Sequence, residues 1–290
     1  MLVITSMSCI GPWGETIESF VEYCKSQTQG NNSTLPEDRH ANIPPVPGFI
    51  ESSFNPLVYR TIQYYAENDR IRDRSKLAII LGSTFGDTAT ADLASRNLLS
   101  GRLRNPLLFY QSVPNSILGY ASSQYQMTEM FTCITYSGGA AAALLEMAEL
   151  YLAMPEVEQV LVIGVETQSE RADEMYMNLT TSAELTKSMD NVVSLMLENG
   201  LTEQAYAERA GSIWVREITR TEASENHLEL EDVVSCPIRV IGNEGLLNIV
   251  LAAEQLNRQD APDGSSCTVL DDTFGGDQYA ITLVRGAHVI

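Results

Sequence analysis

The chain of 290 residues is 44% hydrophobic and 19% charged, a composition that can bury a sizeable core and that excludes an intrinsically disordered protein. Its net charge of −20 repels phosphate backbones, so nucleic acid is not an expected partner. No run of about 18 apolar residues predicts a membrane span. Five scattered cysteines indicate neither a disulfide framework nor a metal site, so a reducing cytoplasm is the expected compartment.

The first half of the chain alternates short apolar runs with segments of helical periodicity. The pattern predicts strands at Leu2–Met7 and Lys76–Leu81, and helices at Glu15–Lys25, Leu57–Ala66, Asp87–Leu99 and, behind Pro114, within Tyr110–Tyr125. Between the first two helices, the segment Gln27–Asn55 is rich in Asn, Pro, Ser and Gly, which predicts a long irregular loop.

The second half continues the same alternation without a linker, a low-complexity tract or an internal sequence repeat. Strands are predicted at Gln159–Val165, Asn191–Leu197, Ser212–Ile218, Cys267–Leu270 and Gln278–Val284, with a helix at Asn248–Gln255. Strands that alternate with helices indicate the α/β class. Because the strands are apolar throughout, both faces of the sheet are expected to be covered, as in a mostly parallel central sheet.

The segment Phe131-Thr-Cys-Ile-Thr-Tyr-Ser-Gly-Gly-Ala140 predicts a strand, a tight glycine turn and the start of a helix that continues to Leu150. Several enzyme folds place a nucleophile at such a turn, because the helix N-terminus favours a thiolate. No cysteine stands at the turn. The nearest thiol, Cys133, lies inside the predicted strand and is interpreted as a buried structural cysteine. The chain therefore has the strand-turn-helix that positions a nucleophile in such folds, but no thiol at the turn.

A serine at the turn leaves a second interpretation open. Ser137 lies between a strand and a helix, as in the nucleophile elbow of an α/β-hydrolase, so a serine hydrolase or acyltransferase is an alternative. Thr135 replaces the first glycine of that motif, and neither His227 nor His288 follows a strand as the required base would. The competing interpretation is that Ser137 is small so that the strand and the helix can pack closely.

Six segments, in order along the chain, resemble the β-ketoacyl synthases of the thiolase superfamily. They are Leu2–Gly14, Ala78–Gly86, Ser112–Tyr125, Val160–Glu166, Asp190–Glu198 and Asp272–Val284. The order makes the resemblance specific, although each match alone is weak. It implies an α/β fold with thiolase-like layers (αβαβα) and a single domain over residues 1–290. Within it, residues 1–200 would form the N-terminal half and residues 201–290 a truncated C-terminal half.

The departures from that family concern its catalytic residues, which are a cysteine, two histidines and a lysine. The cysteine position falls on Ser137 or Gly138, with Tyr136 a further possibility. Asn243 stands at the second histidine, where it would donate to an oxyanion or act as a turn residue, and Ile238 stands at the lysine. No segment matches the motif of the first histidine, and a large piece of the C-terminal half is missing.

This combination resembles the chain-length factor, or ketosynthase β-subunit, of bacterial type II polyketide synthases. In that family the factor pairs with a catalytic ketosynthase, and their shared tunnel limits the length of the poly-β-ketone. The resemblance implies a non-catalytic heterodimer subunit that meets the acyl carrier protein mainly through its partner, since the acidic surface disfavours acidic ligands. The family often has glutamine at the cysteine position and full length, and this chain has neither. A structural acyl-binding subunit of the same fold is the remaining alternative.

The resemblance also implies an interface, a tunnel and no metal or cofactor. The strand Phe131–Tyr136 would pair edge to edge with its counterpart in the partner, and the helix Val113–Tyr125 would lie across the interface. The interface residues would be Phe131, Thr132, Cys133, Ile134, Thr135, Asn115 and Leu118. The tunnel floor would be a row on one helix face, Thr88, Ala91 and Ser95, with Phe85 at its start. Alternatively, this row packs against the neighbouring helix. The acidic stretch Glu225–Asp232 follows no ligand pattern and is interpreted as a solvated loop.

Overall fold

The computed structural model describes residues 1–29, 40–101, 106–127, 130–179, 188–200, 212–221, 232–258 and 261–286. Its strands are β1 (Leu2–Ile10), β2 (Leu77–Gly82), β3 (Phe131–Ile134), β4 (Gln159–Glu166), β5 (Asn191–Asn199), β6 (Ile213–Thr221), β7 (Val233–Val234), β8 (Ser266–Asp272) and β9 (Gln278–Arg285). Its helices are α1 (Ile17–Gln29), α2 (Phe54–Glu67), α3 (Thr88–Leu99), α4 (Pro106–Ser112), α5 (Asn115–Tyr125), α6 (Ala140–Leu152), α7 (Glu170–Leu179) and α9 (Glu244–Leu256), with a 3₁₀ turn at Arg74–Lys76.

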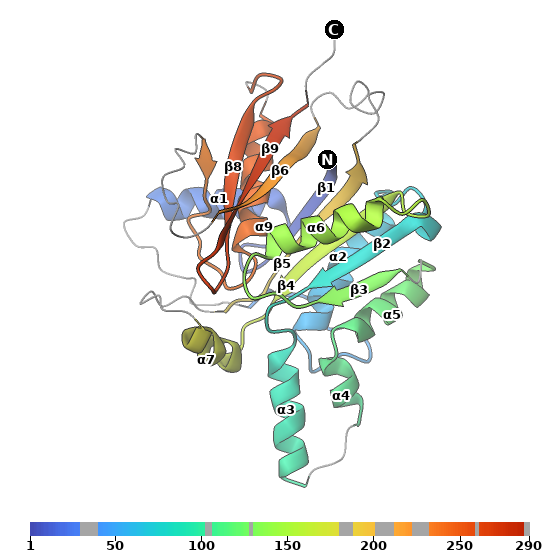
Figure 1. Ribbon diagram of the computed structural model, residues 1–290. Coiled ribbons are helices and arrows are strands. Elements are labelled where there is room, and N and C mark those ends of the chain that lie inside the picture. Colours follow the sequence, from blue (N-terminus) through green and yellow to red (C-terminus); the bar gives the residue numbers. More distant parts are fainter. Residues whose placement is uncertain are drawn as a thin grey trace.

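The described strands form one sheet in the order β3-β2-β4-β5-β1-β6-β9-β8-β7 (Figure 1). The sheet consists of two related groups that meet where Leu2–Ile4 of β1 pairs with Ile213–Val215 of β6. On one side β2 is parallel to β4, and β4, β5 and β1 are antiparallel neighbours. On the other side β7 is parallel to β8, and β8, β9 and β6 repeat that pattern. Two halves with no visible sequence repeat therefore share one pairing scheme.

The second half is the smaller one among the described residues. It has no counterpart of the edge strand β3, and β7 contributes only Val233–Val234 to the sheet. The outer helices α2 and α5 pack against the first half, whereas α9 is the one described helix between β6 and β9. The truncation of the C-terminal half relative to the ketosynthases stays a prediction, because residues 201–211 and 222–231 lie outside the described ranges.

The prediction of a mostly parallel sheet is wrong. Among the described strands, β2/β3, β2/β4 and β7/β8 are parallel, and the other five neighbouring pairs are antiparallel. The apolar runs of β2, β4 and β5 arise because helices cover both faces of this part of the sheet, and that burial does not depend on strand direction.

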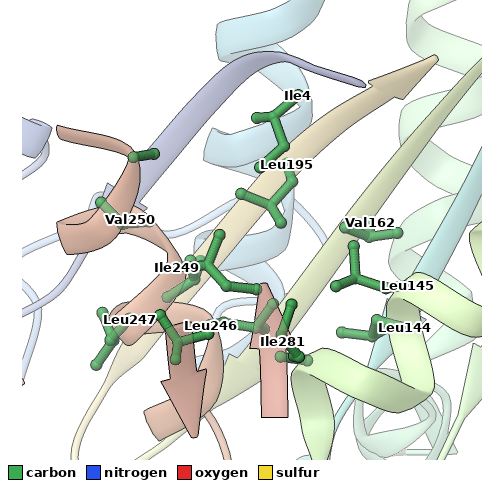
Figure 2. Close-up of a cluster of buried hydrophobic side chains, with 14 of the residues drawn as sticks. Ile4, Leu144, Leu145, Val162, Leu195, Leu246, Leu247, Ile249, Val250 and Ile281 are labelled. Atoms are coloured by element: carbon green, nitrogen blue, oxygen red, sulfur yellow. The ribbon is translucent and has the colours of Figure 1, made fainter. Parts of the chain in front are cut away.

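Two buried helices, α6 and α9, form the central layer and touch each other (Figure 1). Figure 2 shows Leu144 and Leu145 of α6 and Ile249 of α9 pointing toward Val162 of β4 and Leu195 of β5. A second cluster lies on the opposite face of the first half, under α2 and α5. The sheet is thus packed between helices on both sides there, and the turns that precede α6 and α9 are brought together.

Proline divides the helical segment before β3. Pro114 cannot donate a backbone hydrogen bond, and it lies between the end of α4 and the first residue of α5. The helix α7 was not expected from the sequence, and α9 begins four residues earlier than predicted. The other predicted elements are present with small shifts at their ends. In the part of the chain that the structure describes, no helix is both long and apolar enough to cross a membrane.

Candidate functional site

The turn between β3 and α6 is built from two glycines in the left-handed region. Gly138 has a φ of +77° and Gly139 a φ of +66°, which side chains rarely tolerate. The hairpin that joins β8 to β9 covers this turn. The Gly139 N–H donates to the Asp272 carbonyl at 2.8 Å, and the Phe274 N–H donates to the Ser137 carbonyl at 2.8 Å. These two backbone donors are therefore engaged in locking the hairpin onto the turn.

Ser137 is exposed on the outside of the turn. The only histidine in the described ranges, His40, places its Nδ1 3.1 Å from Asp190 Oδ2, and His227 and His288 lie outside those ranges. No base for Ser137 is seen among the described residues.

The prediction that Cys133 is buried is wrong. It is exposed because β3 is the edge strand. Partial desolvation still raises the pKa of its thiol to about 11, so the thiolate is not favoured. The other four cysteines, Cys9, Cys24, Cys236 and Cys267, are buried.

Tyr136 is the residue of the turn whose side chain enters the interior. Its hydroxyl donates to Asn243 Oδ1 across a long 3.4 Å contact, and Asn243 Nδ2 donates to Asn191 Oδ1 at 2.8 Å. All three side chains are buried. Of the three candidates for the cysteine position, Tyr136 is thus the one that contacts the residue at the second histidine position. The Asn243 amide is occupied by Asn191, and the residue immediately precedes α9.

The buried carboxyls of Glu166 and Asp271 lie beside Tyr136, and neither was predicted from the sequence to have a role. Glu166, at the end of β4, accepts the Thr84 N–H at 2.5 Å and the Ser83 hydroxyl at 3.2 Å. Asp271 of β8 accepts the Ala142 N–H at 2.9 Å in the first turn of α6. Burial raises the pKa of each carboxyl to about 7. In the sequence, each of these carboxyls could have been recognised as an acidic residue at the end of an apolar strand.

Burial raises the pKa of Tyr136 well above its ordinary value, and the nearby charges of Glu166 and Asp271 add smaller effects in the same direction. A phenol of this kind stays protonated and is a poor nucleophile at neutral pH. The network therefore holds a proton donor and amides, but no thiolate or imidazole.

Glycines on the surrounding elements leave no spare volume around these side chains. A Cβ at Gly82 would lie 2.6 Å from Tyr136 Cε1, and one at Gly164 would lie 2.5 Å from Asn243 Oδ1. A Cβ at Gly242 would overlap Glu166, and one at Gly245 would overlap Asp271. The interior is therefore close-packed at these four glycines.

Beside this interior, a pocket of about 350 Å³ opens between the β8–β9 hairpin and the turn before α9. Phe274 lines it and is flanked by the ring of Phe85, at a centroid distance of 6.4 Å, and by that of Tyr176, at 5.3 Å. Phe85 thus packs on the hairpin at the start of the predicted tunnel row.

The row itself lines a groove of about 730 Å³ between α3 and α7. Thr88, Ala91 and Ser95 face this groove, and Ala91 and Ser95 are exposed. Ser95 Oγ donates to the Ala91 carbonyl at 2.8 Å, within the helix. Ala91 and Ser95 are therefore open on this face of α3, whereas Thr88 is half-buried.

The predicted interface residues surround the outer edge of β3, on which no described strand pairs. Cys133, Thr135 and Asn115 are exposed, and Phe131, Thr132 and Ile134 are half-buried. The prediction that Leu118 contacts the partner is wrong, because its side chain is only 1% exposed and belongs to the core under α2 and α5. The helix α5 turns Leu118 inward together with Ile117 and Ala121, so its side chain is not available to a partner.

The arm formed by α3 and α4 projects from the body in Figure 1 and exposes large apolar side chains. Phe109 is 72% exposed and Leu99 is 88% exposed. Leu98, Leu107 and Tyr110 are exposed on the same two helices. Large apolar side chains gathered in this way indicate a surface that another molecule covers.

The chain matches no protein-family model and no curated protein. Among solved structures, the ishigamide ketosynthase/chain length factor superposes with a TM-score of 0.73 at 12% identity. The ketosynthase ApeO in complex with its chain length factor ApeC from Xenorhabdus doucetiae gives 0.61 at 17% identity. The complex AntDE:AntF, a type II polyketide synthase acyl-carrier protein with its ketosynthase bound to the hexaketide, gives 0.68 at 14% identity. Each match covers 98% of this chain and 99% of the other chain.

At sequence identities this low, the superpositions show that these chains share a fold. The protein therefore has the α/β, thiolase-like fold found in ketosynthases. This confirms the fold class predicted from the six ordered segments.

Proposed function

We propose that this chain is a non-catalytic chain-length factor that pairs with a catalytic ketosynthase and helps to set poly-β-ketone length in polyketide biosynthesis. The observation that carries the proposal is the turn before α6. It has no thiol, and Tyr136 and Asn243 contact each other where a cysteine and a histidine would meet. The likeness in fold to structures that contain ketosynthases and chain length factors supports the same assignment.

The closed interior supports the absence of catalysis by this chain alone. Acyl transfer needs an activated nucleophile and free donors aimed at the developing oxyanion. Here the Gly139 and Phe274 N–H groups bond within the protein, and the Asn243 amide bonds Asn191. The Tyr136 and Asn243 side chains also pack directly against Gly82 and Gly164, where a Cβ would overlap them.

The unpaired edge of β3 and the apolar arm support the proposed partner. An edge strand offers free backbone groups to a strand of another chain, and β3 pairs only with β2 among the described residues. The exposed side chains of α3 and α4 would extend that contact. We propose that the acyl carrier protein is met mainly through the ketosynthase, because this chain carries a net charge of −20. The cytoplasm is the proposed compartment.

Co-purification tests the pairing directly. The tagged chain is expressed with a catalytic ketosynthase from the same organism and analysed by light scattering. A one-to-one complex with polyketide synthase activity is expected, whereas each subunit alone is expected to be inactive. A stable monomer that ignores every ketosynthase of its organism would contradict the proposal.

Replacing Ser137 with alanine is expected to leave product formation by the complex within a few-fold of normal. The hydroxyl is exposed, and no described base lies beside it. Cys133→Ala is the matched control at the neighbouring thiol, with the same expectation. Turnover by the purified complex is the measurement. Loss by several orders of magnitude for Ser137→Ala alone, as for a removed nucleophile, would favour the hydrolase or acyltransferase alternative.

Replacing Ala91 with phenylalanine is expected to shorten the polyketide product. The added ring would fill part of the α3–α7 groove, which we propose the growing chain occupies in the complex. Mass spectrometry of the released products gives the chain length. Ala94→Phe lies on the same helix but outside the groove lining, so it should leave the length unchanged. If an intact Ala91→Phe complex makes products of the same length as the unaltered complex, α3 does not limit the length of the polyketide.

A further inference from the structure

Two buried thiols meet between parts of the chain that are remote in sequence. Cys24 of α1 and Cys236, which follows β7, are 212 positions apart, and their Sγ atoms lie 3.8 Å from each other. Each residue is only 4% exposed, and both thiols are free. This is the distance of two sulfur atoms in van der Waals contact, and a disulfide would bring them to a bond length of about 2.0 Å.

The contact joins α1 to the buried segment that leads from β7 to α9. Cys236 follows the two-residue strand β7 and begins the segment that leads to Asn243 and the start of α9. The segment is anchored at this point by the Cys236 N–H, which donates to Asn248 Oδ1 at 2.6 Å. On the other side, α1 belongs to the N-terminal half and packs against β1. A bond between the two sulfurs would therefore join the two halves covalently.

We propose that Cys24 and Cys236 form a reversible disulfide when the protein meets a peroxide oxidant, and that this bond staples the second half to α1. Hydrogen peroxide oxidises one thiol to a sulfenic acid and releases one water. The second thiol then attacks the sulfenic sulfur, the S–S bond forms and a second water leaves. Two thiols and one peroxide thus give one disulfide and two waters. In a reducing compartment the bond is transient and is reversed by dithiols.

Burial sets the expected rate. The contact with the Cys24 thiol, together with burial, raises the pKa of Cys236 well above its ordinary value, so little thiolate is present in the folded protein. Oxidation is therefore slow in native buffer and faster at a urea concentration below the unfolding transition. A disulfide that closes so long a loop restricts the unfolded chain, so the oxidised protein should melt several degrees higher than the reduced protein.

The test uses the full chain with Cys133→Ser, because Cys133 is exposed and would form bonds between molecules. After treatment with hydrogen peroxide, the protein is unfolded, alkylated and weighed by mass spectrometry. Four alkylated thiols are expected before oxidation and two afterwards, with a peptide that links Cys24 to Cys236 and a higher Tm. Dithiothreitol should restore all four thiols and the original Tm.

Three further variants make the result specific. Cys24→Ser and Cys236→Ser, each in the same background, should keep three alkylated thiols after oxidation and show no rise in Tm. Cys267→Ser, a buried cysteine elsewhere, should still lose two thiols. The proposal is overturned if four thiols survive prolonged oxidation, if the linked peptide contains another pair such as Cys9 with Cys236, or if the disulfide forms without a change in Tm.

Discussion

Gly138→Ala is expected to destabilise the protein by roughly 3 kcal/mol or more, from the strain of a left-handed residue and from overpacking. Gly138 has a φ of +77°, and a Cβ built there lies 2.6 Å from the Asp272 carbonyl oxygen and 2.8 Å from the Phe274 nitrogen. These are backbone atoms of the β8–β9 hairpin, which cannot swing aside as the end of a side chain can. Urea unfolding followed by circular dichroism measures the loss.

Gly264→Ala is the matched control for this prediction. Gly264 has a φ of +82°, but no atom lies within 4 Å of the position where its Cβ would stand. The control carries the same kind of backbone strain without the collision, so a loss of about 1 kcal/mol is expected. Equal losses for the two variants would mean that the hairpin does not press on the turn.

The free energy of unfolding is expected to fall as the pH rises from about 5 to about 8. Burial raises the pKa of Glu166 and of Asp271 to about 7, above the usual value near 4 that each has in the unfolded chain. Between these values the folded state keeps protons that the unfolded state releases, so the slope of stability against pH is negative. The contribution is fully present below the unfolded pKa and is lost once the pH passes about 7.

The size of this effect follows from about 1 kcal/mol per pKa unit, so the two carboxyls together account for several kcal/mol. Urea unfolding at intervals between pH 5 and pH 8 gives the slope. Glu166→Gln and Asp271→Asn should each flatten the curve, because an amide does not titrate. Glu146→Gln, on an exposed position of α6, is the control for the general acidity of the surface and should leave the slope almost unchanged. If both interior variants keep the full slope, other groups cause it.

Several features of this protein were evident in the sequence because they depend on neighbouring residues. Apolar runs and helical spacing located most strands and helices, and the glycine turn before α6 was read from Ser137, Gly138 and Gly139. The missing thiol at that turn is likewise a fact of the sequence, and the six ordered segments predicted the fold class. Such patterns are local, since strand and helix periods are set by the backbone of each segment.

Other features were decided only by the tertiary structure, because they depend on which distant segments meet. Apolar strands have the same composition in parallel and antiparallel pairs, so the mixed sheet was not predictable from them. The spacing within one turn could not tell whether Tyr136 or Ser137 points inward. That choice follows from packing of the turn against Asn243, which lies more than a hundred positions away. Cys133 is exposed because β3 lies at the edge of the sheet, and Leu118 is buried because it packs in the core under α2. Burial by segments distant in sequence raises the pKa values of Glu166 and Asp271.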